Sequence, residues 1–327
     1  MQFEGIYTPA VTPFNEDDSI HYDAFLDVID HLVDAGVHGI IVGGTTGEYY
    51  VESVEERLQL LALAKERCGD KTPVIFGTGS FNPNESILLA EEAAKLNADA
   101  LLVASPPYSL PTERELATHA MAVDRAANLP IMLYNYPSRM GVMMGEEFLD
   151  RVGKSANVCA IKESSGDINR LHLLARDYPH IQLSCGMDDQ ALEYFAWGAK
   201  SWVCAGSNFL AAEHIALYQA CVLDGDFAKG RRIMSAMMPL MRVLEQGGKF
   251  IQSVKHGLTI EGLFSGKVRR PLYGLNKDEK RQLEQVIRVL KTTIAQILAE
   301  PATQASTASK TTASKTAANH AKTALGV

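Results

Sequence analysis

The sequence has few of the features that mark secreted or membrane proteins. It holds five cysteines in 327 residues, an odd number with no close pairs, so the pattern of a disulfide framework is missing. The N-terminus lacks a charged segment followed by an apolar one, and no apolar run approaches the roughly 20 residues that a membrane helix needs. We therefore expect a cytoplasmic protein that does not contact a membrane.

Basic stripes and metal-ligand motifs are missing as well. The net charge is −8, and no run of lysine and arginine could neutralise a series of phosphates, which argues against a nucleic-acid partner. His38 and His119 stand alone, and no cluster of His, Cys, Asp and Glu has metal-ligand spacing. We expect chemistry that uses neither a metal ion nor another cofactor.

The sequence does contain a regular alternation of strand-like and helix-like segments. Short apolar runs bounded by turn residues are typical of buried parallel strands, and amphipathic segments with helical spacing lie between them. The expected strands are Gly5–Val11, Gly39–Val42, Pro73–Thr78, Ala100–Ala104, Pro130–Tyr134, Val158–Lys162, Ile181–Cys185 and Ser201–Ala205. The expected helices are Tyr22–Ala35, Val54–Cys68, Glu85–Leu96, Glu113–Ala126, Gly145–Gly153, Asn169–Asp177, Asp189–Trp197 and Ala211–Leu223.

Eight strand–helix pairs predict an α/β fold, a (β/α)8 TIM barrel over residues 1–225. The competing architecture is an open doubly wound sheet. That sheet usually has a Gly-rich dinucleotide turn after its first strand, where this chain has Thr8–Pro13.

Residues 226–300 carry further helical patterns, which we expect to form a C-terminal helical region packed on the barrel. Residues 301–327 are rich in Ala, Ser, Thr and Lys, with too little apolar surface to offset the entropy of ordering, so we expect a disordered tail. The three helical patterns are Phe227–Glu245, Phe250–Gly262 and Lys277–Leu298.

Lys162 ends the sixth expected strand and is followed at once by a polar turn. In a TIM barrel the active site lies at the C-terminal ends of the strands. Burial disfavours the ammonium form, which makes the amine available as a nucleophile for a carbonyl carbon. Lys71 and Lys200 precede strands and fall on the opposite face. The alternative is that Lys162 extends its charged head to a nearby surface.

Loops after two other strands supply polar groups to the same face. Gly43–Glu48 offers backbone N–H groups and the hydroxyls of Thr45 and Thr46, which suit a carboxylate anion, although an ordinary tight turn would look the same. Tyr134 ends the strand beside that of Lys162 and could move protons, or simply pack the barrel mouth. Arg139 could hold a substrate carboxylate or cap a loop.

Two more loops point to this mouth. Tyr108 follows the fourth strand and leads toward the same face. Asp188 and Asp189 follow the seventh strand, where we expect them to cap the N-terminus of the next helix.

Three motifs, in this order, resemble the dihydrodipicolinate synthase / N-acetylneuraminate lyase family over approximately residues 3–298. They are Gly44-Thr45-Thr46-Gly47-Glu48, Tyr134-Asn135-Tyr136-Pro137 and Ile161-Lys162-Glu163. The resemblance implies a class I lyase in which Lys162 forms a Schiff base with pyruvate or another 2-keto acid. It also implies a homotetramer arranged as a dimer of dimers.

The resemblance further assigns roles to single residues. Thr45 and Thr46, with Gly44 in the same motif, would bind the keto-acid carboxylate, and Tyr134 would be the acid and base. In the synthase branch Tyr134, Thr46 and a tyrosine from a neighbouring subunit form a proton relay, and Tyr108 matches that last position. Arg139 matches the arginine that binds the carboxylate of the second substrate.

Several positions depart from the pattern of lysine-making synthases. These positions are Tyr49, Tyr50, Phe81, Pro107 and Tyr136. They leave the Schiff-base chemistry untouched but bear on the second substrate. The leading hypothesis is an activity like that of dihydrodipicolinate synthase, joining pyruvate to an aldehyde, and Arg139 favours a dicarboxylate-type substrate. The alternatives are a dehydratase, deaminase or aldolase of a sugar-acid- or hydroxyproline-derived keto acid, and a non-catalytic keto-acid-binding protein.

Overall fold

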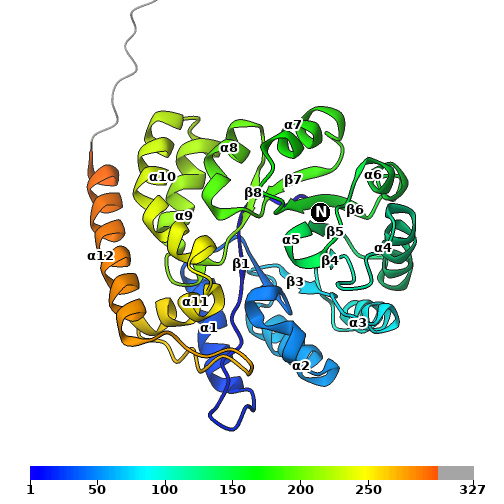
Figure 1. Cartoon of the computed structure of the whole chain (residues 1–327), viewed down its shortest axis with the longest axis horizontal. Coiled ribbons are helices and arrows are strands. Elements are labelled where there is room, and N and C mark those ends of the chain that lie inside the picture. The colour runs from blue at the N-terminus through cyan, green and yellow to red at the C-terminus, as the bar shows by residue number, and fades with distance from the viewer. Residues whose placement is uncertain (301–327) are drawn as a thin grey trace, which may run out of the picture.

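Eight parallel strands close into a barrel in chain order in the computed structural model, which describes residues 1–300 (Figure 1). The closing pair is β8 with β1, in which Gly5 lies beside Ser201 and Tyr7 beside Val203. The predicted TIM barrel is confirmed. The strands are β1 Gly5–Pro9, β2 Gly39–Val42, β3 Val74–Gly77, β4 Ala100–Ala104, β5 Ile131–Asn135, β6 Val158–Glu163, β7 Gln182–Cys185 and β8 Ser201–Val203.

Helices follow the strands and surround the barrel. Three of them begin with capping boxes, at Ser53, Thr112 and Asn276. In a capping box, the first side chain accepts a hydrogen bond from the backbone N–H three residues later, and the glutamate there accepts one from the N–H of the capping residue. The helices are α1 Tyr22–Asp34, α2 Val54–Cys68, α3 Pro83–Lys95, α4 Glu113–Ala127, α5 Pro137–Met140, α6 Glu146–Val152, α7 Ile168–Asp177, α8 Ala191–Ala196, α9 Ala211–Tyr218, α10 Phe227–Met241, α11 Phe250–Ile260 and α12 Lys277–Ala299.

Two differences from the expected elements concern the barrel mouth. The sequence did not predict α5, a single turn that begins at Pro137 directly after β5. The expected helix over Phe227–Glu245 ends as an α-helix at Met241 and continues as a wider π-helical turn over Arg242–Gln246. Pro239 lies inside α10 and has no N–H to donate, which weakens the regular helical bonding just before this turn.

Apolar side chains form one layer inside the barrel and one around it. The inner layer fills the barrel, as is usual for eight strands, so the fold encloses a packed core and not a pore. The outer layer lies between the strands and the helices and includes C-terminal residues such as Ile233 and Ile287. The inner layer consists of Phe3, Tyr7, Ile41, Ile75, Ala100, Leu102, Ala104, Met132, Tyr134, Met140, Ala160 and Val203.

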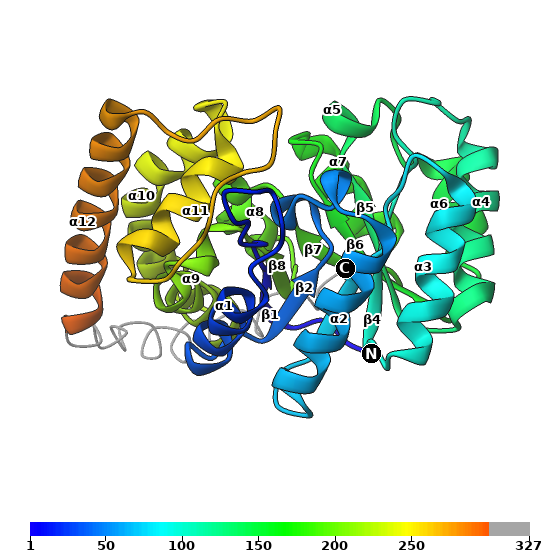
Figure 2. The ribbon, with the colours of Figure 1, turned by 90° about the horizontal axis from the view of Figure 1, so that it is seen from below.

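The C-terminal helices pack against one side of the barrel (Figure 2). Helix α10 packs on α8, α9 and α12, while α11 contacts α12. A stripe of buried aliphatic side chains at helical spacing holds α12 against its neighbours. Within residues 1–300, no helix is both long and apolar enough to cross a membrane. The division between residues 225 and 226 stays a prediction, and the tail expected over 301–327 lies outside the described residues.

A buried ion pair joins α11 to the loop after β2. Lys255 Nζ lies 2.6 Å from Glu48 Oε1, and the two side chains are 4% and 0% exposed. The other oxygen, Glu48 Oε2, accepts a hydrogen bond from the backbone N–H of Arg269 at 3.1 Å. Because both charges are removed from water, removing either one would leave the other buried without a counter-charge.

We expect that Lys255→Met will lower the free energy of unfolding by about 3–5 kcal/mol, because it leaves the Glu48 carboxylate buried without a counter-charge. Urea denaturation of the purified protein measures the change. The matched control is Lys249→Met, since Lys249 pairs with Glu279 where both side chains are about a third exposed. This control should shift stability by less than about 1 kcal/mol. Equal effects of the two substitutions would contradict the importance of the buried pair.

Candidate active site

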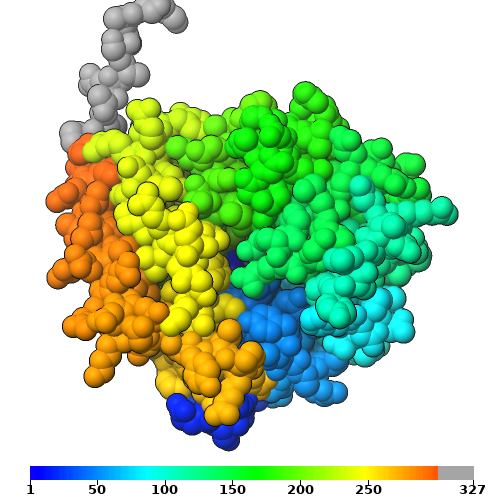
Figure 3. Space-filling model, viewed as in Figure 1, coloured from blue at the N-terminus to red at the C-terminus, as the bar shows by residue number. Residues whose placement is uncertain are grey.

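A cavity opens at the C-terminal ends of the strands. Figure 3 shows the hollow where segments coloured blue, green and yellow meet. The cavity encloses about 550 Å³, including its open mouth. Its lining comes from the barrel and from the C-terminal helical region and consists of Pro9, Ile41, Gly44, Thr45, Thr46, Leu102, Tyr134, Tyr136, Arg139, Lys162, Gly186, Asp188, Val203, Ala205, Glu245 and Phe250.

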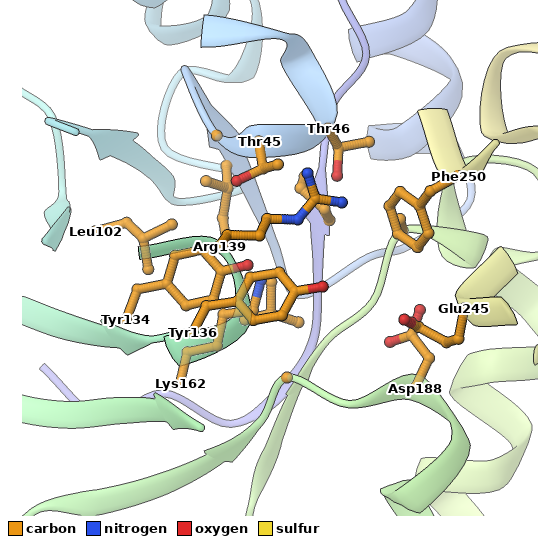
Figure 4. Close-up of a pocket in the computed structure, with 16 residues that line it drawn as sticks. Thr45, Thr46, Leu102, Tyr134, Tyr136, Arg139, Lys162, Asp188, Glu245 and Phe250 are labelled. Carbon is orange, nitrogen blue, oxygen red and sulfur yellow. The ribbon is translucent and has the colours of Figure 1, made fainter. Parts of the chain in front are cut away.

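Lys162 lies at the base of this cavity, one residue before the end of β6 (Figure 4). Its side chain is buried, and its Nζ lies 4.0 Å from the centre of the Tyr134 ring. Burial lowers the pKa of the Lys162 amine to about 8, although the nearby Asp188 carboxyl group acts in the opposite direction. A large fraction of the amine is therefore uncharged at slightly alkaline pH, and an uncharged amine is the form that attacks a carbonyl carbon.

Tyr134 lies directly beside Lys162 on the adjacent strand β5. The register of β5 and β6 places the two residues side by side. Burial raises the pKa of the Tyr134 phenol above its usual value, while the positive charge of Arg139 opposes that shift. The phenol is therefore protonated at neutral pH, so it can donate a proton to a group bound at Lys162.

The loop after β2 forms the wall of the cavity beside Tyr134. Thr45–Gly47 make a short 3₁₀ turn, and Gly44, Thr45 and Thr46 all line the cavity. Gly43 precedes this turn with a φ of +70°, and an added Cβ would lie 3.2 Å from the Phe76 ring. A residue with a side chain would be both strained and crowded there, so glycine permits the turn. Backbone N–H groups and two hydroxyls can then face an anion.

Arg139 and Tyr136 form the side of the cavity that is more open to solvent. The guanidinium carbon of Arg139 lies 5.3 Å from the centre of the Tyr136 ring. The rings of Tyr136 and Tyr134 are 5.7 Å apart between centroids. Arg139 itself is exposed. The short helix α5 carries Arg139 and thereby sets its position above the cavity.

Neither Asp188 nor Asp189 caps a helix, and that expectation was wrong. A 3₁₀ turn over Asp188–Gln190 follows β7, so α8 begins only at Ala191, and no side chain caps it. The Asp188 carboxyl group turns toward the barrel instead, where its Oδ1 accepts a hydrogen bond from Trp202 Nε1 at 2.8 Å. Burial raises the pKa of Asp188 to about 6, and the bond from Trp202 opposes this.

Two lining residues come from the C-terminal helical region, which the sequence predicted only to pack on the barrel. Glu245 lies in the π-helical turn after α10, and Phe250 begins α11. Strand-end position identified the other candidates, but neither of these residues follows a strand. Within residues 1–300, no group of three or more His, Cys, Asp and Glu side chains is arranged to hold a metal ion.

Tyr108 does not reach the cavity of its own chain. Its side chain is 89% exposed, on the loop between β4 and α4. The structure therefore brings together Lys162, Tyr134, Thr45, Thr46, Gly44 and Arg139, and leaves Tyr108 outside.

Comparisons with known proteins give one family. The model of the dihydrodipicolinate synthetase family matches residues 2–290. The 4-hydroxy-tetrahydrodipicolinate synthase of Exiguobacterium sibiricum is 36% identical over 290 residues, which are 88% of this chain and 98% of the relative. Synthase 1 of Halalkalibacterium halodurans is 33% identical over 288 residues, with coverages of 88% and 97%.

Solved structures agree with this assignment. The structure of 4-hydroxy-tetrahydrodipicolinate synthase from Methylacidiphilum fumariolicum SolV matches with a TM-score of 0.85 and 30% identity, over 91% of this chain and 99% of that one. YagE of Escherichia coli K12, a protein of the dihydrodipicolinic acid synthase family in complex with pyruvate, matches with a TM-score of 0.82 and 28% identity, with coverages of 89% and 99%. The chain thus belongs to the dihydrodipicolinate synthetase family and is a Schiff-base-forming lyase of that family.

Proposed function

We propose that the protein holds pyruvate, or another small 2-keto acid, as a Schiff base on Lys162 and joins it to an aldehyde, as a 4-hydroxy-tetrahydrodipicolinate synthase does. The observation that carries this proposal is the buried Lys162 amine, whose pKa is lowered to about 8 beside a protonated tyrosine and an anion-binding loop. Pyruvate in complex with YagE supports the choice of keto acid.

The reaction follows from the chemistry of the amine. The Lys162 amine attacks the keto carbon, and the carbon–oxygen bond breaks with loss of water to leave an iminium ion. The iminium ion draws electrons from the adjacent carbon, which loses a proton and becomes an enamine. The enamine carbon then forms a bond to the aldehyde carbon, whose oxygen takes up a proton. Return of water to the imine would release the product and regenerate Lys162.

The residues of the cavity have separate tasks in this proposal. Thr45, Thr46 and the backbone at Gly44 bind the keto-acid carboxylate, because their donors converge on one wall of the cavity. Tyr134 moves protons to and from the adduct, since its ring contacts the Lys162 amine. Arg139 binds the second substrate at the outer side of the mouth.

The same Schiff base also suits a second group of enzymes, which act on a different keto acid. A dehydratase, deaminase or aldolase of a sugar-acid- or hydroxyproline-derived keto acid would use the same Schiff base. The observation that favours this group is the acidic side of the cavity, where Asp188 and Glu245 lie together. A non-catalytic keto-acid-binding protein would need no lowered amine pKa.

We also propose a cytoplasmic homotetramer, built as a dimer of dimers. The loops at the barrel mouth expose large apolar side chains, which a second copy of the chain could cover. These side chains are Tyr50, Phe81, Tyr108 and Leu110, with exposures of 38%, 64%, 89% and 59%. Tyr108 would then complete the proton relay of Tyr134 and Thr46 in the partner's site.

We expect that borohydride reduction in the presence of pyruvate will add one pyruvate-derived mass to Lys162, because the reductant fixes the Schiff base as a stable amine. Peptide mass spectrometry locates the adduct. Lys162→Ala should abolish both the adduct and turnover. An adduct on another lysine, with activity surviving the substitution, would sink the proposal.

Tyr134→Phe is the matched control for that experiment, because it keeps the ring and removes only the hydroxyl. This variant should still form the pyruvate adduct, though slowly. Its turnover should fall by about 10²–10⁴, as expected for loss of a general acid and base.

We expect the rate of adduct formation with pyruvate to depend on pH through Lys162. The protonated amine is unreactive, so the rate should rise with pH and level off above about 8, where the amine is uncharged. An ordinary surface lysine would continue to gain reactivity up to roughly pH 10. Pulsed borohydride trapping between roughly pH 6 and pH 10 gives the profile. A rate still rising steeply above roughly pH 9 would contradict the effect of burial.

We expect two inactive variants to restore activity when their subunits mix. Tyr108→Phe removes the donated hydroxyl, and Lys162→Ala removes the nucleophile, so in a mixed dimer one site holds both native residues. Sedimentation verifies the assembly, and an activity assay follows subunit exchange. A fully active monomer, or no recovery despite proven exchange, would overturn the shared site.

A further inference from the structure

Glu245 enters the active-site cavity from outside the barrel. The π-helical turn Arg242–Gln246 carries it, and this turn packs on the 3₁₀ turn after β7 that carries Asp188. Gly247 and Gly248 end the turn directly afterwards. π-turns commonly occur at functional sites, where the widened helix changes the direction of a side chain. Glu245 is half-buried and lines the same cavity as Lys162.

Glu245 faces Asp188 at the side of the cavity opposite Leu102 and Tyr134. Figure 4 shows the two carboxyl groups next to each other, with Phe250 beside them. Asp188 is 2% exposed, and the bond from Trp202 fixes one of its oxygens. Asp189 adds a third carboxyl group nearby, and its Oδ1 is buried without a hydrogen-bond partner among the described residues.

The proximity of these acids keeps a proton at this side of the cavity. Burial raises the pKa of Glu245 to about 8, and the charges of Asp188 and Asp189 add to the shift, while Lys162 and Arg139 oppose it. Because two neighbouring carboxylates disfavour double ionisation, the Asp188–Glu245 pair holds about one proton near neutral pH. Such a pair can both donate and accept hydrogen bonds.

We propose that Glu245 is a specificity-determining residue, which with Asp188 selects a hydroxyl-bearing aldehyde over one that bears a second carboxylate. The proposal rests on the Schiff-base function of Lys162. For the second substrate, it replaces the carboxylate-bearing aldehyde of a 4-hydroxy-tetrahydrodipicolinate synthase with a hydroxyl-bearing aldehyde. A substrate held on Lys162 and extending toward Phe250 reaches the Asp188–Glu245 pair. A hydroxyl group can hydrogen-bond to either member of this pair.

A substrate carboxylate at the same place would add another negative charge to three neighbouring acids. Like charges at short distance in a partly desolvated pocket repel strongly, so this substrate would have to force a further protonation. Arg139 offers an attractive charge, but its guanidinium lies over the ring of Tyr136. The negative side of the cavity therefore opposes the dicarboxylate-type substrate that Arg139 by itself favours.

The experiment compares two aldehydes as partners of pyruvate: glyceraldehyde, which carries hydroxyls, and succinic semialdehyde, which carries a carboxylate. The native enzyme should show at least a roughly tenfold higher kcat/KM with glyceraldehyde. Glu245→Ala should lower this value about tenfold, the effect of one lost hydrogen bond, chiefly through KM. The same variant should leave succinic semialdehyde unchanged or improve it.

Glu245→Gln and Glu284→Gln serve as controls. The amide that replaces the Glu245 carboxyl group would keep a donor and an acceptor, so Glu245→Gln should retain most of the glyceraldehyde activity. Glu284 lies on α12, away from the cavity, and contacts His256, so Glu284→Gln should match the native enzyme with both aldehydes. Thermal melting verifies that every variant folds.

Pyruvate trapping on Lys162 distinguishes a failure of the proposed Glu245 role from a failure of the Schiff-base function. If trapping succeeds but the native enzyme prefers succinic semialdehyde, or Glu245→Ala leaves the ratio of the two kcat/KM values unchanged, the role of Glu245 is overturned and the Schiff-base function stands. If the native enzyme traps neither pyruvate nor any other small 2-keto acid, both are overturned. Trapping with the expected loss in Glu245→Ala supports both.

Discussion

The chemistry available at the cavity depends on the burial of one amine, that of Lys162. Lys162 lies in the barrel mouth with little access to water, so its charged form is disfavoured and its pKa falls to about 8. A barrel of eight parallel strands can impose this burial, because its interior is filled by side chains up to the level of the cavity. The same register that positions Lys162 brings the Tyr134 ring within 4.0 Å of the amine.

The C-terminal helices complete the site as well as cover the barrel. Lys255 on α11 forms the buried pair with Glu48, and Glu48 belongs to the same loop as Thr45 and Thr46, which line the cavity. Glu245 and Phe250 reach the cavity from the connection between α10 and α11. Packing and chemistry therefore meet in this region, and a change in how α10 and α11 dock would alter the environment of Lys162.

The sequence predicted those parts of the site that depend on strand ends. A parallel barrel places all its strand C-termini on one face, so a residue's position in the strand pattern was enough to bring Lys162, Tyr134 and the loop at Thr45 together. The same rule gave no direction for side chains in the turns that follow the strands. Asp188 was therefore expected to cap a helix, whereas an intervening 3₁₀ turn directs it toward Trp202.

The sequence by itself determined the barrel and the position of Lys162 and Tyr134 at its mouth, because alternating periodicities and strand-end positions are local properties of the chain. Only the tertiary structure decided which charges surround that lysine. Glu245 comes from a turn widened after Pro239, and it follows no strand whose end could have located it. Its proximity to Asp188 depends on the docking of two segments far apart in the sequence, and no pattern within either segment predicts that contact. The pKa values of these groups follow from that contact, because desolvation and neighbouring charge exist only once the chain is folded.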